Sequence, residues 1–141
     1  MRKAILAVAS VVALTACGTT GPTRLGTGNV VFVYVTVKKD GTLAAYPEWV
    51  AVRNKNTEIV WRLAADPKYT FTDEAIVIED DPLGEFDNCK TGKPGKKEDD
   101  GYSFVCKDNN HKQGDKQPRI YKYTIKVNGV RDPLDPWVFN D

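Results

Sequence analysis

The sequence predicts an all-β fold, an antiparallel Greek-key β-sandwich. Beyond residue 28, segments rich in β-branched residues alternate apolar and polar positions, as strands with one buried face do. Gly, Pro, Asn and Asp separate these segments, and no stretch repeats apolar residues at helical spacing. Because 141 residues amount to one domain's worth of chain, a single sandwich accounts for the sequence.

The strands are expected in short segments with turns between them. The first alternates valines with aromatic and polar residues and ends in a turn at Asp40-Gly41. The last is expected at a sheet edge, because Pro136 has no N–H to donate to a central ladder. The complete set is 31–38, 46–53, 58–63, 75–79, 102–106, 119–128 and 136–140.

Three aromatic residues are assigned to the core. Trp61 alternates with apolar neighbours, and Tyr121 and Tyr123 share one face of the segment 119–128. Large aromatic side chains on an apolar face are most often buried. By contrast, the polar stretch 80–100 offers few residues to bury, so a long loop is expected there.

The charges of the chain nearly cancel. Lys and Arg number 20, against 19 Asp and Glu. A near-neutral body has no field strong enough to gather phosphates, so nucleic-acid binding is not expected. His111 is the single histidine, which limits the side chains available for metal or general-base chemistry.

The first sixteen residues are typical of a secretion signal. Two basic residues precede the apolar run 4–16, which at about 1.5 Å per residue is too short to cross a bilayer. The sequence therefore divides into a signal peptide at 1–16, a Gly- and Thr-rich flexible tether at 17–28 and a sandwich domain at 29–141.

The end of the signal, Leu14-Thr15-Ala16-Cys17, resembles the lipobox of bacterial lipoproteins. The resemblance implies cleavage before Cys17, which then carries a thioether-linked diacylglycerol and an amide-linked acyl chain such as palmitate. Several acyl chains hold a protein on a membrane almost permanently. Gly18 replaces the Asp that keeps many lipoproteins at the inner membrane, so an outer-membrane anchor facing the periplasm is favoured. The alternative is an ordinary secretory signal in which Cys17 carries no lipid.

Cys89 and Cys106 remain as a pair once Cys17 is acylated. Two thiols in a small domain of an oxidising compartment usually form a disulfide, which the sequence predicts here. The alternative is a metal site that combines these cysteines with His111. Structural zinc prefers four strong ligands in paired short spacings, and only three soft ligands are present, so no metal is expected.

Several segments are similar to strands of cupredoxin-like domains: 46–53 and 57–63 to the early strands, and 101–106 and 120–127 to the closing ones. The resemblance implies a cupredoxin-like or immunoglobulin-like sandwich. It does not imply electron transfer, because a blue-copper site needs two His, a Cys thiolate and usually a Met. The expected class is therefore a cupredoxin-like envelope lipoprotein that lacks copper ligands and binds no cofactor.

Trp49 and Trp137 are the candidate partner contacts. Each lies at the edge of an expected element, where an exposed indole can anchor a partner, although packing is the more frequent use of such a ring. The preferred function is a non-catalytic, lipid-tethered module that binds an envelope protein or polymer, with its oligomeric state left open. The alternative is a small envelope hydrolase or metal-dependent enzyme that uses the His111 loop.

Overall fold

The computed structural model describes residues 24–26, 28–92, 100–111 and 118–141. The strands are β1 (Val30–Val37), β2 (Leu43–Tyr46), β3 (Trp49–Val52), β4 (Thr57–Leu63), β5 (Ile76–Ile78), β6 (Phe86–Thr91), β7 (Ser103–Asp108), β8 (Arg119–Ile125) and β9 (Trp137–Asn140). The signal segment, Cys17 and most of the tether lie outside the described residues.

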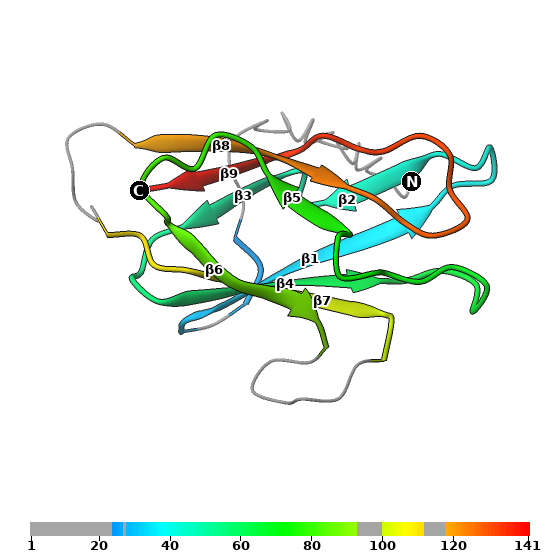
Figure 1. Ribbon diagram of the computed structural model, residues 1–141, viewed down its shortest axis with the longest axis horizontal. Helices are drawn as coiled ribbons and strands as arrows, with labels where there is room; N and C mark the ends of the chain where they lie inside the picture. Colours follow the sequence, from blue (N-terminus) through cyan, green and yellow to red (C-terminus); the bar gives the residue numbers. More distant parts are fainter. Residues whose placement is uncertain (1–23, 27, 93–99, 112–117) are drawn as a thin grey trace, which may run out of the picture.

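The strands form two packed sheets, seen as an upper and a lower layer in Figure 1. One sheet has five strands in the order β2-β1-β4-β7-β6, and the other has four in the order β3-β9-β8-β5. No helix occurs among the described residues, and that part of the chain accordingly holds no helix long and apolar enough to cross a membrane. The predicted all-β sandwich is confirmed.

Strand direction differs from the expectation at two places. Five of the seven strand pairs are antiparallel, but β1 runs parallel to β4 and β3 runs parallel to β9. At Tyr46-Pro47 the chain leaves the five-stranded sheet after β2 and enters the other sheet as β3. It then returns as β4 in the direction of β1. The predicted strand 46–53 therefore corresponds to β3 together with the last residue of β2, and the rest of β2 was missed.

The core lies between the inner faces of the sheets. Val31, Val33 and Val35 of β1 are fully buried, as their alternation predicts. Trp61 of β4 is fully buried too, with its ring centroid 5.4 Å from that of Tyr123 in the opposite sheet and the planes at 64°. Such edge-to-face contacts add about 1 kcal/mol to the gain from area burial. The burial predicted for Trp61, Tyr121 and Tyr123 is confirmed.

Two sequence-based expectations are corrected at the end of the chain and in the segment 80–100. The strand β9 lies between β3 and β8 and is not an edge strand. Pro136 lies directly before β9, so its missing N–H removes no hydrogen bond from the strand. The Pro136 carbonyl accepts the N–H of Tyr123 at 3.1 Å. The segment 80–100 contains β6, which pairs with β7 through a register shift between Asp87 and Lys90.

Candidate functional site

Trp49 and Trp137 lie next to each other on paired strands. They begin β3 and β9, and the parallel register of these strands sets the two residues opposite each other. Their ring centroids are 6.3 Å apart and the rings are tilted by 47°. The next residues in register, Val50 and Val138, are fully buried in the core, so the tryptophans belong to the outer face of the four-stranded sheet. The structure thus brings together the two residues singled out in the sequence.

The outer face continues with further apolar residues. Phe139 follows Trp137 by two positions on β9 and is half-buried, and Ile120 of β8 lies opposite it with 51% of its surface exposed. We call Trp49, Trp137, Phe139 and Ile120 the tryptophan face. Three adjacent strands, visible as β3, β9 and β8 in Figure 1, contribute to it.

Charged side chains border the tryptophan face. Lys122 lies beside Trp137 in the register, and its Nζ is 3.1 Å from Asp135 Oδ2 and 3.7 Å from Glu79 Oε2. The Thr124 hydroxyl lies 2.9 Å from Glu79 Oε1 and 2.9 Å from Asp135 Oδ1. The hydrogen bond from Lys122 lowers the pKa of the Asp135 carboxyl and raises that of the ammonium, so both stay ionised near neutral pH. A polar rim beside an apolar centre is the usual arrangement of a recognition surface.

His111 lies at one end of the sandwich against a buried carboxylate. Its backbone N–H donates to Glu85 Oε2 at 2.7 Å, and its Nδ1 is 3.2 Å from the same oxygen. Glu85 is 1% exposed, and its other oxygen is 3.7 Å from a guanidinium nitrogen of Arg119. The His111 side chain remains 58% exposed. A carboxylate removed from water is tolerated where cationic groups and N–H donors surround it, as they do here.

Asp108 is the second buried carboxylate at this end. It is fully buried at the end of β7, where its Oδ1 accepts the backbone N–H of Asn110 at 2.9 Å and the side-chain amide of Asn140 at 3.1 Å. Its Oδ2 has no hydrogen-bond partner among the described residues. Burial raises the pKa of the Asp108 carboxyl to about 7, and the charge of Glu85 acts in the same direction, while the two hydrogen bonds oppose it.

We call Glu85, Asp108, His111, Arg119 and Asn140 the polar cluster. Its members come from both sheets, since Asp108 belongs to β7 and its amide donor, Asn140, to β9. Within the described ranges, no Ser or Cys is hydrogen-bonded to His111, and no three His, Cys, Asp or Glu side chains are grouped to hold a metal ion. The contacts of the cluster tie the two sheets together at one end.

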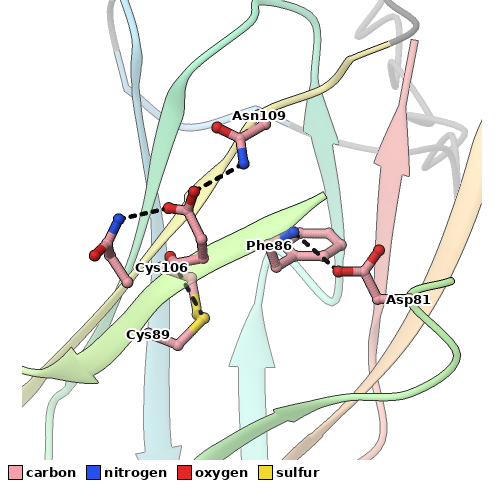
Figure 2. The surroundings of a disulfide bond; sticks show 7 residues. Asp81, Phe86, Cys89, Cys106 and Asn109 are labelled. Atoms are coloured by element: carbon pink, nitrogen blue, oxygen red, sulfur yellow. Dashed lines mark hydrogen bonds between the residues drawn. A yellow bond between two sulfur atoms is a disulfide. The ribbon is translucent and has the colours of Figure 1, made fainter. Parts of the chain in front are cut away.

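The predicted disulfide between Cys89 and Cys106 is confirmed (Figure 2). It joins the neighbouring strands β6 and β7, with Cys89 exposed and Cys106 fully buried beneath the sheet. Both sulfurs are occupied by this bond, so neither is a thiolate ligand for a metal. In an entropic treatment, a cross-link across a separation of 17 residues stabilises the fold by about 3 kcal/mol.

The polar cluster was not found by sequence reasoning, except for His111. Glu85 and Asp108 are single acids in polar or mixed segments and show no spacing that marks a site. Only Asp108 has a sequence signal, since it lies in the run Cys106-Lys-Asp-Asn-Asn-His111, whose polar residues directly follow an apolar strand. No protein-family model and no curated protein matches the chain.

Proposed function

We propose that this chain is a lipid-anchored, non-catalytic binding module of the bacterial cell envelope, and that the tryptophan face contacts its partner. The lipobox-like segment ending at Cys17 supports the anchor. The pairing of Trp49 with Trp137 on an outer sheet face supports the contact surface. The partner is a protein or a polymer of the envelope. The sandwich domain binds it while the tether 17–28 links the domain to the lipid anchor.

The single observation that carries the contact surface is the exposure of apolar side chains that the core does not use. Trp49 is 38% exposed and Ile120 is 51% exposed, whereas the inner positions of the same strands are closed by buried aliphatic and aromatic side chains. Tryptophan is among the residues that contribute most at protein interfaces, because one ring covers a large area at a small cost in side-chain entropy. A partner that covers this face removes its exposed apolar area from water, which favours binding.

The contact surface is tested by photo-crosslinking in cells. A diazirine-bearing amino acid replaces Ile120, so that Trp49 and Trp137 stay intact beside it. The expected result is an adduct of defined mass that is lost when Trp49→Ala and Trp137→Ala are combined. The matched control places the same probe at Tyr34, which is 43% exposed on the five-stranded sheet. Equal adducts at positions 34 and 120, or an adduct at 120 that persists without the tryptophans, would contradict the proposed surface.

The anchor is tested separately by metabolic labelling. Radiolabelled palmitate is expected to enter the full-length protein and to be lost with Cys17→Ser, which also releases the protein from membrane fractions. Retention of label or of membrane association in Cys17→Ser would overturn the lipid anchor. The result of this experiment does not depend on the tryptophan face.

A second candidate function, a small envelope hydrolase, is favoured by one observation. His111 Nδ1 lies 3.2 Å from the buried Glu85 carboxylate while most of the His111 side chain stays exposed, as in a histidine oriented by an acid. Among the described residues, a hydrogen-bonded nucleophile is missing beside His111, which is why binding is the preferred function. Loss of a measured hydrolytic activity in His111→Ala would reverse this preference.

A further inference from the structure

The two sheets leave a pocket open between β5 and β6. Among the described strands, each of these two is the last in its sheet: β5 pairs with β8 alone, and β6 pairs with β7 alone. A pocket of about 380 Å³ lies between them. Its apolar walls come from Ile76, Val77 and Ile78 of β5, and from Phe86 and the exposed half of the disulfide, Cys89, on the β6 side.

The rim of the pocket is acidic. Asp73, Glu74 and Asp81 line it, and no Lys or Arg is among its described lining residues. Two of the carboxylates are held in place: Asp73 Oδ1 accepts the Thr91 hydroxyl at 2.8 Å, and Asp81 accepts the backbone N–H groups of Glu85 and Phe86 at 2.8 and 3.0 Å. Figure 2 shows Asp81 and Phe86 near the disulfide. An apolar cavity bordered by fixed negative charges is complementary to a ligand that carries both apolar and cationic groups.

The edge of β5 also presents to the pocket side backbone groups that no described strand pairs with. Towards β8, the carbonyl of Ala75 accepts the N–H of Lys126 at 2.7 Å, and the N–H of Glu79 donates to Lys122 at 2.9 Å. Because antiparallel strands alternate, Val77 also turns its N–H and C=O towards β8, opposite Thr124. The backbone N–H and C=O groups of Ile76 and Ile78 therefore point to the free edge of β5. A free edge of this kind pairs readily with an added strand.

We propose that β5 accepts an extended, basic segment of a partner protein as an added strand. The backbone of the segment pairs with Ile76 and Ile78, alternate apolar side chains enter the pocket over Phe86, and its Lys or Arg side chains meet the acidic rim. This site lies on the opposite edge of the four-stranded sheet from Trp49 and is independent of the tryptophan face. The acidic rim also disfavours pairing of this edge with a second copy of the chain, because like charges would meet.

The test uses a synthetic nine-residue peptide of alternating Lys and Val, titrated into the full-length protein in detergent. A dissociation constant on the order of 0.1 mM is expected for so short an edge. Two peptides serve as probes of the mechanism: an acidic version with Glu in place of Lys, and a version N-methylated at every residue, which keeps charge and side chains but has no backbone N–H to donate to a strand on either edge. Neither is expected to bind measurably.

A matched pair of protein variants localises the site. Glu74→Lys reverses one rim charge without removing a described hydrogen bond and is expected to weaken binding about three- to fivefold, the range for one exposed charge. Glu48→Lys makes the same change beside Trp49 and is expected to leave the affinity unchanged. No binding of the basic peptide, equal binding of the acidic or N-methylated peptide, or equal weakening by both variants would overturn the proposal. Trp49→Ala, which tests the tryptophan face, leaves this peptide affinity unchanged.

Discussion

The tryptophan face and the polar cluster are opposites in how the fold treats their side chains. On the tryptophan face, large apolar groups remain in contact with solvent, and the core beneath them is complete without them. In the polar cluster, two carboxylates are removed from solvent, and each is held by hydrogen bonds or cationic neighbours within the chain. Buried polar groups of this kind usually serve the fold, whereas unused exposed apolar area usually serves a partner. We therefore expect the polar cluster to serve the stability of the fold, and we propose that the tryptophan face serves recognition.

The largest effect is expected from Glu85→Ala in the polar cluster. The change removes the acceptor of the His111 N–H and a charge that faces Arg119. Breaking a buried ion pair costs roughly 3 to 5 kcal/mol, so a loss of about 3 kcal/mol in the free energy of unfolding is expected by urea denaturation. The control is Glu58→Ala, on a half-exposed position of β4. An equal, small loss in both variants would remove the structural role given to the cluster.

A smaller and opposite effect is expected from Asp108→Asn. The folded protein keeps the Asp108 proton up to a pKa of about 7, whereas the unfolded chain releases it near 3.8. The wild type therefore loses stability as the pH rises from about 4 to about 7, and the loss is constant above that. The asparagine variant lacks this contribution and should be more stable at pH 8, by about 2 kcal/mol. Urea denaturation at pH 5 and pH 8 measures this difference in the free energy of unfolding, and Asp132→Asn serves as a control at an exposed position. A variant less stable than the wild type at pH 8 would contradict the burial argument.

His111→Ala is expected to have a modest effect on stability. In the variant, the backbone N–H of residue 111 still donates to the Glu85 carboxylate, so only the partly exposed side-chain contact is lost. We expect the free energy of unfolding to fall by about 1 kcal/mol. The cross-link from position 120 is expected to be unchanged. If the cross-link disappears while the variant stays folded, the separation between the two regions fails.

A stability effect no larger than that of His111→Ala is expected from Trp49→Thr. Trp49 is 38% exposed on an edge strand, and threonine suits a strand, so the free energy of unfolding should fall by about 1 kcal/mol. Binding is nevertheless expected to weaken strongly, because the variant removes half of the tryptophan pair. Thermal melting and the position-120 cross-link, measured on the same preparation, check both parts. A large loss of stability would mean that Trp49 belongs to the core.

Strands were predictable where one face of the strand is apolar and the other polar. The strands β1, β4 and β8 follow this alternation and were found with nearly their true bounds. The strand β6 was missed because its residues Asn88, Cys89 and Lys90 are exposed, so no apolar face marks it. Local alternation also could not reveal that the chain changes sheets at Pro47, because the period of a strand does not record which sheet the strand joins.

The sequence by itself determined the fold class, the core faces of the long strands and the pairing of Cys89 with Cys106, because each follows from short-range pattern or from residue count. Only the tertiary structure decided which strands are neighbours. The packing of the strands places Trp49 beside Trp137, although the two residues are far apart in the chain. It also buries Glu85 and Asp108 away from water. The physical reason is that exposure and charge environment depend on the whole packing of the sheets, whereas alternation along a strand records only which side faces inward.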